Sequence, residues 1–335
     1  MFPEIDRWWL DTASDQLYVV ASYLGVFNNI STTNGSILPA RFISALSPTP
    51  TTFYIQGGLW LDAASDQMYV LSSPPNYYNS YSSILVFTAA STISGDVAPA
   101  RVISGAKTAL NSPNALWLDS TSDQLYVSSG GNSVGNGILN EGGNCILVFT
   151  DASTINGDVA PARVISGTTT GLKSIVALWV DATSDQIYAL SSRPPSYYKT
   201  NSSILVFTDA STISGDIAPA RVISGTTTEL SEARAFWLDA VSDQLYVSNG
   251  GNNNILVFNN ASTINGDVAP ARVISGTTTG LNFPDAMWLD TASDQLYVST
   301  RTSKEISSKG SRVLVFTLAS TINGNIAPSR IIGLK

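Results

Sequence analysis

The side chains that could carry chemistry in this chain are mainly carboxylates and tyrosines. Histidine is absent, and Cys145 is the single cysteine. Because histidine is the commonest general base and metal ligand, its absence excludes Ser-His-Asp and Cys-His catalysis. A lone thiol also excludes a disulfide framework and a cysteine-based metal site. We therefore expect no catalytic residue, no metal site and no cofactor, and we predict that the chain is not an enzyme.

Paired tyrosines beside paired prolines are the first candidate ligand-binding residues. The motif Pro-Pro-x-Tyr-Tyr occurs twice, at 74–78 and 194–198. Prolines restrict the chain before binding, and tyrosine rings give a large contact area at a small entropic cost. We predict that these rings contact a protein or a glycan; the alternative is that they pack over neighbouring structure. The candidates are Tyr77, Tyr78, Tyr197 and Tyr198.

A second candidate set lies three residues before each of six regularly spaced tryptophans. Its members with a polar side chain are Asp6, Asn114, Arg234 and Asp285. Carboxylate and amide oxygens are typical ligands of hard cations such as Ca²⁺. Arg234 opposes a cation, however, and Gly57 and Val176 at the two remaining positions offer no side-chain ligand. We therefore treat this set as candidate ligand-binding residues without a metal.

Charge and hydropathy limit the kinds of partner. The net charge is −8, and the 17 basic residues are scattered rather than clustered. This excludes a nucleic-acid partner, because such proteins need a positive field to collect phosphates. No apolar run approaches the roughly 18 residues of a membrane span, so we expect no membrane insertion. The low charge, the Ser/Thr/Asn-rich connections and the single thiol favour an extracellular or cell-surface location.

One sequence unit occurs six times and accounts for nearly the whole chain. Each copy contains Trp-x-Asp, then Ser-Asp-Gln, a Tyr, a Val-Phe pair and Pro-x-Arg. In the third copy, the segments ALWLD, QLYVSS, CILVFT and ARVISG are rich in β-branched and aromatic residues and are bounded by turn-forming residues, as strands are. The first and last copies are nearly standard, which favours a closed ring over a capped linear array. The sequence therefore predicts an all-β, six-bladed β-propeller with four antiparallel strands per blade.

We expect one propeller domain over residues 1–335, with each blade formed by one continuous copy. The expected blades are at about 1–50, 51–110, 111–172, 173–230, 231–281 and 282–335. The fourth strand carries Pro and Arg, which are typical of sheet edges, so it should be outermost and the first strand should line the axis. We expect ring closure to need only packing of the first blade on the last.

The repetition separates structural residues from candidate site residues. A residue present in every blade is most simply explained by what every blade needs, whereas a single ligand site must break the symmetry. We therefore interpret the Asp of Trp-x-Asp as a cap of the following turn, the Trp as a core residue, and the Arg of Pro-x-Arg as a packing residue, an edge guard or the partner of a turn Asp. The connections between second and third strands vary most, and they contain both Tyr pairs.

The order of these motifs resembles the NHL repeat. Segment 284–290 (PDAMWLD) with the following QLYVS carries the resemblance, as does 245–258 (LYVSNGGNNNILVF). The resemblance implies the propeller but not one activity, because NHL-like and lactonase-like propellers serve many roles. Related hydrolases hold a metal at the axial opening with Glu, Asp and Asn, and Asp6, Asn114 and Asp285 could imitate that set. The repeats are also similar to those of bacterial surface proteins, which implies export.

These observations lead us to predict a non-enzymatic binding or structural module. Its ligand, a protein or a glycan, should contact the face formed by the connections between second and third strands. A metal-dependent hydrolase or lactonase working at the axial opening is the first alternative. A self-assembling surface protein is the second, and the oligomeric state stays open.

Overall fold

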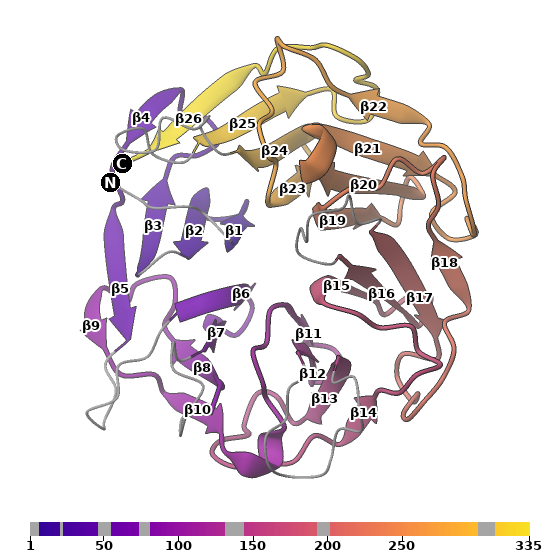
Figure 1. Cartoon of the computed structure of the whole chain (residues 1–335). Coiled ribbons are helices and arrows are strands. Elements are labelled where there is room, and N and C mark those ends of the chain that lie inside the picture. Colours follow the sequence, from indigo (N-terminus) through magenta and orange to yellow (C-terminus); the bar gives the residue numbers. More distant parts are fainter. Residues whose placement is uncertain are drawn as a thin grey trace.

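Six β-sheets form a ring about a common axis (Figure 1). In this computed structural model, the described residues are 7–20, 23–45, 55–73, 81–130, 144–192, 202–300 and 312–335. Among them the helical segments are two short 3₁₀ turns, η1 (Ala106–Thr108) and η2 (Gly250–Asn252). No helix in this part of the chain is long and apolar enough to cross a membrane. The predicted all-β, six-bladed propeller is confirmed.

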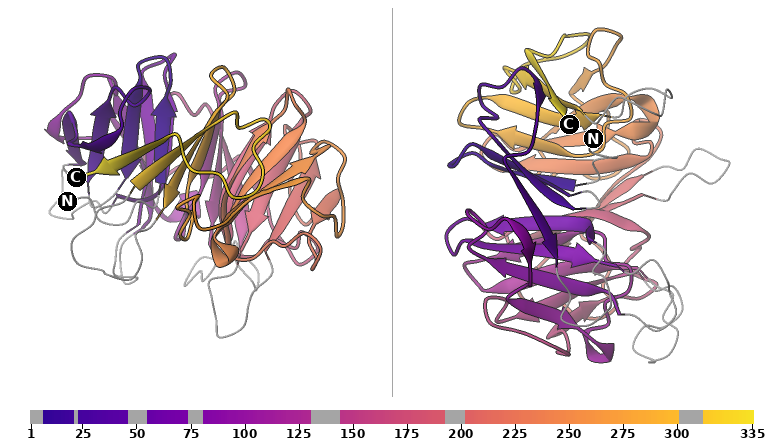
Figure 2. Two further views of the ribbon diagram at one scale, coloured as in Figure 1. Left: turned by 90° about the horizontal axis from the view of Figure 1, so that it is seen from above. Right: turned by 90° about the vertical axis from the view of Figure 1, so that its left-hand side faces the viewer.

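Each sheet contains four antiparallel strands that follow one another in sequence from the axis outward (Figure 1). The innermost strands are β1 (Arg7–Asp11), β6 (Ile55–Asp62), β11 (Leu116–Asp119), β15 (Ile175–Asp181), β19 (Ala233–Asp239) and β23 (Met287–Asp290). The second strands are β2 (Gln16–Val20), β7 (Gln67–Ser72), β12 (Gln124–Ser129), β16 (Gln186–Ser191), β20 (Gln244–Asn249) and β24 (Gln295–Thr300). In side view, the strands run between the two open ends of the ring (Figure 2).

The outer half of each sheet repeats in the same way. The third strands are β3 (Leu24–Asn28), β8 (Ser83–Thr88), β13 (Cys145–Thr150), β17 (Ser203–Thr208), β21 (Asn254–Asn259) and β25 (Arg312–Thr317). The fourth strands are β5 (Arg41–Ala45), β10 (Arg101–Ser104), β14 (Arg163–Ile165), β18 (Arg221–Ile223), β22 (Arg272–Ile274) and β26 (Arg330–Leu334). Two further short strands, β4 (Gly35–Ile37) and β9 (Gly95–Val97), belong to connections between third and fourth strands.

The hydrophobic core lies between neighbouring sheets. Six clusters of buried side chains each join two adjacent blades, and one of them joins the last blade to the first through Tyr297, Val315, Trp8 and Phe27. The second and third strands are buried on both faces, which explains why their residues are apolar without alternation. The interfaces between blades are therefore the main source of apolar burial in the ring.

Ring closure differs from the expectation. Each connection between third and fourth strands lies in parallel against the fourth strand of the preceding blade: β9 pairs with β5, and Ile165 bridges to Gly215. The same pairing joins the ends of the chain, because β4 of the first repeat pairs with β26 of the last, Ile332 opposite Gly35 (Figure 1). The expectation that ring closure needs only packing of the first blade on the last was therefore wrong. An unpaired fourth strand exposes a row of backbone donors and acceptors, and the added segment covers them.

The arginine of Pro-x-Arg links each blade to the next. Arg101 Nη1 donates to the carbonyl oxygens of Ala152 and Ile155, both at 2.8 Å, in the next repeat. Its Nη2 donates to Gln67 Oε1 at 2.7 Å, and the guanidinium lies 5.8 Å from the centroid of the Tyr69 ring. The packing role is confirmed, but the carbonyls and the Gln, rather than a turn Asp, are the partners.

In the third blade, both aspartates of the turn between the first and second strands are structural. Asp119 Oδ1 accepts hydrogen bonds from the backbone N–H groups of Thr121 at 3.0 Å and Ser122 at 3.4 Å, as the capping interpretation predicted. Asp123, at φ 53°, accepts from the N–H of Ser153 at 2.8 Å and from its hydroxyl at 2.7 Å. The second Asp therefore ties this turn to the start of the outer connection of the same blade.

Candidate functional site

The two open ends of the ring carry different connections. One end, which we name the repeat face, carries the turns from first to second strands and the connections from third to fourth strands. The other end, the variable face, carries the connections from second to third strands and those leading into the next blade. The antiparallel order of the strands requires this division. The candidate ligand-binding residues that the structure describes, Asn114, Arg234 and Asp285, lie at the variable-face end of the innermost strands.

Arg7 crosses the axial opening. Its Nη2 donates to Asn114 Oδ1 at 3.1 Å and to the carbonyl oxygen of Val176 at 3.0 Å, so a side chain of the first blade reaches the third and fourth blades. The sequence analysis did not single out Arg7, although the sequence does distinguish it. The other five copies have small residues at the same position. These are Gly58, Ala115, Ala177, Ala235 and Ala286.

Both polar atoms of the Asn114 side-chain amide make hydrogen bonds. Its Oδ1 accepts from Arg7, and its Nδ2 donates to the carbonyl oxygen of Ile175 at 3.4 Å. An oxygen that accepts from a guanidinium is a poor cation ligand, because a metal ion there would face the positive charge of Arg7. Among the described residues, no group of three His, Cys, Asp or Glu is arranged to hold a metal ion.

Arg234 and Asp285 occupy the fifth and sixth blades. The guanidinium of Arg234 lies 4.8 Å from the centroid of the Phe283 ring, a cation–π distance. Asp285 is 3% exposed; its N–H donates to the carbonyl oxygen of Ser299 at 3.1 Å, and its own carbonyl accepts from the Ser248 hydroxyl at 3.2 Å. Among the described residues, this end of the ring thus has two guanidinium groups, an aromatic ring and one buried carboxylate.

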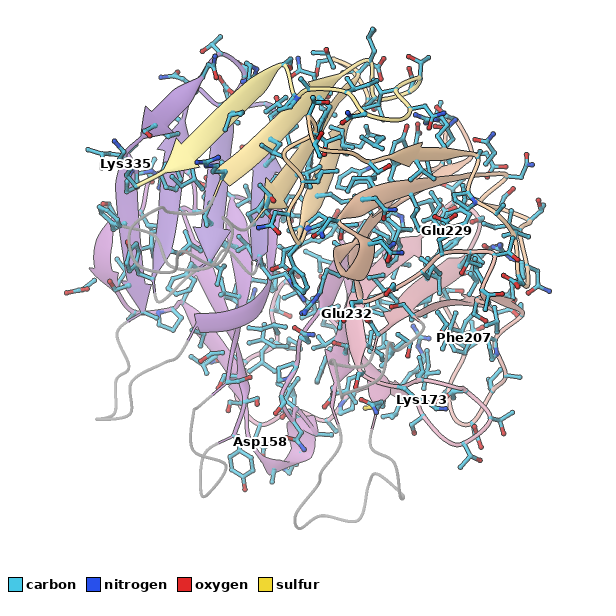
Figure 3. The ribbon with its side chains drawn as sticks, turned by 45° about the horizontal axis from the view of Figure 1, so that its top comes forward. Asp158, Lys173, Phe207, Glu229, Glu232 and Lys335 are labelled. Atoms are coloured by element: carbon cyan, nitrogen blue, oxygen red, sulfur yellow. The ribbon has the colours of Figure 1, made fainter. Side chains whose placement is uncertain are left out.

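In the fifth blade, backbone hydrogen bonds fix the connection between the second and third strands to the variable face. The N–H groups of Gly250 and Gly251 donate to the carbonyl oxygens of Glu232 at 3.2 Å and Ser231 at 2.9 Å. Glu229 and Glu232 flank this segment (Figure 3). The same region supports the cation–π pair, because Asn253 Oδ1 accepts from the N–H of Phe283 at 2.6 Å. This connection is an ordered part of the surface around Arg234.

The remaining candidates lie outside the described residues. These are Asp6 and the four tyrosines Tyr77, Tyr78, Tyr197 and Tyr198. The nearest described aromatic residue of the second blade's connection is Tyr81, which is 57% exposed. The tyrosine site therefore stays a prediction, and the geometry of the opening concerns Asn114, Arg234 and Asp285 together with Arg7 and Phe283.

The repeated tryptophans form a closed ring around the axis. Neighbouring indoles have centroids 4.3 to 4.8 Å apart, and the first pairs with the last at 4.7 Å. All six are only partly buried, and each packs against one of the six core clusters, so they border the core and also line the axis. The first strand lines the axis with one of its sides, and Trp lies on that side. The ring consists of Trp9, Trp60, Trp117, Trp179, Trp237 and Trp288.

Comparison with solved structures supports the fold alone. A chain of the nidogen/laminin complex has 16% identity and a TM-score of 0.58, covering 95% of this chain and 92% of its own. A protein of unknown function from Bacteroides caccae has 8% identity and a TM-score of 0.55, covering 95% and 98%. Luciferin-regenerating enzyme has 11% identity and a TM-score of 0.52, covering 97% and 94%. No protein-family model and no curated protein sequence matches the chain.

Proposed function

We propose that the chain is a non-enzymatic binding module whose variable face contacts a protein or a glycan. The observation that carries this proposal is the unequal distribution of irregular residues. The bonds that recur from blade to blade secure the repeat face and the rim. Arg7, Asn114 and the Arg234–Phe283 pair depart from the repeat, and both pairs belong to the variable-face end of the ring.

The chemistry of the opening supports a polar ligand without a reaction. Arg234 offers donors for carboxylate or hydroxyl oxygens, and the Phe283 ring provides an apolar surface beside it. The fifth blade's connection is already bonded to the face, so less conformational entropy would be lost on binding. The paired tyrosines would extend the same contact surface outward from the axis.

The comparisons are compatible with more than one role. One similar chain belongs to a complex of two named proteins, and another is described as an enzyme. The NHL-like motif order and the lack of histidine favour the binding role over a metal-dependent hydrolase or lactonase. We also propose an extracellular or cell-surface location, supported by a single thiol and by only 13% charged residues.

Two matched variants test the proposed function. The first replaces Tyr77, Tyr78, Tyr197 and Tyr198 by Ser; the second combines Arg7→Ala with Arg234→Ala. Val241→Ser is the control, because Val241 is 95% exposed in a turn of the repeat face. On a glycan array and an extracellular-protein array, either face variant should lose the ligand that the wild type and the control bind.

Each outcome has a clear meaning. Loss of binding with an unchanged melting temperature supports the variable face as the binding surface. Binding retained by both face variants contradicts the proposal. Hydrolysis of a lactone panel by purified wild type, abolished by a chelator and restored by a divalent cation, would establish the hydrolase alternative instead.

A further inference from the structure

An Asn-Gly pair occurs in four of the six connections between third and fourth strands. The four pairs are Asn34-Gly35, Asn156-Gly157, Asn265-Gly266 and Asn323-Gly324, and the second and fourth repeats have Ser94-Gly95 and Ser214-Gly215 instead. All six glycines have φ between 76° and 105°, and a Cβ added to any of them would meet nothing within 4 Å. Backbone conformation, rather than a lack of space, therefore requires glycine at this position.

In the third repeat, the Asn-Gly pair is bonded to the fourth strand of the preceding blade. Asn156 Oδ1 accepts from the N–H of Val102 at 2.9 Å, and the N–H of Gly157 donates to the carbonyl oxygen of Val102 at 2.7 Å. The carbonyl oxygen of Gly157 accepts from the N–H of Ser104 at 3.1 Å. We name these three hydrogen bonds the latch. The same three bonds join Asn265-Gly266 to Val222 and Ser224, and Asn323-Gly324 to Val273 and Ser275.

The latch holds two groups that can react with each other. In deamidation, the backbone nitrogen of Gly157 forms a bond to Asn156 Cγ, the Cγ–Nδ2 bond breaks, and ammonia leaves with the proton of the Gly157 nitrogen. Water then opens the five-membered succinimide at one of its two carbonyl carbons and leaves either aspartate or isoaspartate. The reaction needs only water, and glycine has no side chain to hinder the attack.

The latch opposes this reaction in the folded protein. The Gly157 N–H is held by the carbonyl of Val102, and the Asn156 carboxamide is held by the N–H of the same residue. Turning the nitrogen toward Cγ therefore requires both bonds to break. Asn156 is exposed, so access of water does not limit the reaction. Local openings of this kind cost less free energy than unfolding of the whole chain.

We propose that the Asn-Gly pairs are deamidation sites whose rate is set by opening of the latch between neighbouring blades. Isoaspartate adds one carbon to the main chain before Gly157, so the acceptor and the donor no longer match the N–H and carbonyl of Val102. A transient opening then becomes permanent and uncovers backbone groups of β10, a strand edge. This modification is independent of the binding role proposed above.

Incubation of the wild-type protein gives the first test. Native protein and protein unfolded in urea are kept at pH 8, and aspartate and isoaspartate are located by mass spectrometry of peptides. At Asn156, Asn265 and Asn323 the native protein should react at least about ten-fold more slowly than the unfolded protein. Equal rates in the two states would overturn the proposal.

Arg101→Ala tests whether the latch itself sets the rate. Arg101 Nη1 donates at 2.8 Å to the carbonyl oxygen of Ile155, the residue before Asn156, so its loss should loosen this latch. Deamidation at Asn156 should become about three- to ten-fold faster, while the rate at Asn265 should stay that of the wild type. No acceleration, or equal acceleration at both sites, contradicts control by the individual latch. If Arg101→Ala does not fold, Arg101→Lys serves instead.

Arg221→Ala is the matched variant for the fifth repeat. Arg221 Nη1 donates at 3.0 Å to the carbonyl oxygen of Ile264, the residue before Asn265. This variant should accelerate deamidation at Asn265 and leave the rate at Asn156 unchanged, which is the reverse of the pattern for Arg101→Ala. The same pattern in both variants would mean that general loss of stability, rather than the latch, sets the rate.

The effect of the product on the latch is tested by amide hydrogen exchange. Protein with isoaspartate at position 156 is compared with Asn156→Asp, which represents the other product and keeps an acceptor oxygen in place. The N–H groups of Val102 and Gly157 should lose protection in the isoaspartate form and keep it in Asn156→Asp. Equal protection in the two forms would overturn the inference that isoaspartate keeps the latch open.

Discussion

At the repeat face every blade makes the same bonds, whereas at the variable face the blades differ from one another around the axis. The turn Asp123 accepts from Ser153 in the third blade, and Asp185 accepts from Ser211 in the same way in the fourth. Three residues before the tryptophan, by contrast, one blade has Gly57, another Val176 and another Arg234. Repetition thus marks what holds the ring together, and its interruption marks the residues at which we propose that a ligand is recognised.

The largest expected effect comes from alkaline pH, because it acts on all six blades. Burial raises the pKa of each second-strand tyrosine above its ordinary value of 10.0, and the hydrogen bond from the blade's arginine only partly opposes this. The folded chain then keeps protons that the unfolded chain loses. The free energy of unfolding should therefore be constant with respect to these groups below about pH 10 and fall as the pH rises above it.

Urea unfolding as a function of pH measures this effect. The control is Tyr126→Phe, which keeps the ring and removes one titrating hydroxyl, so its decline above about pH 10 should be shallower. Tyrosinate absorbance should show one group of tyrosines ionising only as the protein unfolds. A urea midpoint that is independent of pH in this range would contradict the burial of the six hydroxyls.

Removing one link between blades should have the next largest effect. Arg163 donates to the carbonyl oxygens of Ala210 at 2.8 Å and Ile213 at 2.9 Å and to Gln124 Oε1 at 2.5 Å. Arg163→Ala leaves these acceptors unpaired, so the free energy of unfolding should fall by about 2–3 kcal/mol. Arg163→Lys keeps the charge without the planar fork and should recover only part of the loss. A cost below about 0.5 kcal/mol for Arg163→Ala would show that the arginines are mere surface residues.

A single turn cap should matter less. Asp119→Ala removes the acceptor of the Thr121 and Ser122 N–H groups and should cost about 0.5–2 kcal/mol in urea unfolding. Binding at the variable face should be unchanged, since the turn lies at the opposite end of the ring. A variant that keeps full stability but loses ligand binding would contradict the assignment of structural residues to the repeat face and binding residues to the variable face.

Replacing Trp8 by Phe should change stability little. The buried Nε1 of Trp8 has no acceptor, so its removal relieves a desolvation cost that offsets much of the lost packing. The fifth blade already has Phe236 at the equivalent position, buried between the fourth and fifth blades, so a phenyl ring fits this type of interface. We expect a change within about 1 kcal/mol by urea unfolding, compared with about 3–5 kcal/mol for a typical Trp→Ala in a core.

The smallest effect is expected at the single thiol. Burial raises the pKa of Cys145 to about 12, so very little thiolate is present near neutral pH. Native protein at pH 8 should react with iodoacetamide far more slowly than urea-unfolded protein does, as measured by mass spectrometry. Equal rates would mean that the start of β13 opens readily.

The strands and their order could be predicted because the same pattern of strand and turn residues occurs in six copies. The Trp-x-Asp and Ser-Asp-Gln motifs place the turns, and the alternation of apolar and turn residues places the strands. The pairing of β4 with β26 could not be read in the same way, because Asn34-Gly35 indicates a turn but not the strand that the turn will touch. Backbone pairing between neighbouring blades does not require particular side chains, so the residue types do not reveal it.

The candidate site was predicted only in part. Asn114, Arg234 and Asp285 were selected because they break the repeat, whereas Arg7, which lies one residue further along its repeat, was not selected. The tryptophans were predicted as core residues from their perfect repetition, and each does pack against a core cluster between blades. Alternation along the inner strand also brings them to the axis, which explains why they are only partly buried.

The pairing of β4 with β26 also determines how the molecule can fluctuate. In a linear array, terminal repeats touch one neighbour and fray first. Here the first and last blades each have two neighbours, joined by the same parallel contact and the same kind of apolar cluster as any other pair. Releasing any blade disrupts two junctions at once, so no blade is a natural starting point for partial unfolding. Amide hydrogen exchange should accordingly report one shared opening for the six β-sheets rather than a gradient from the chain ends inward.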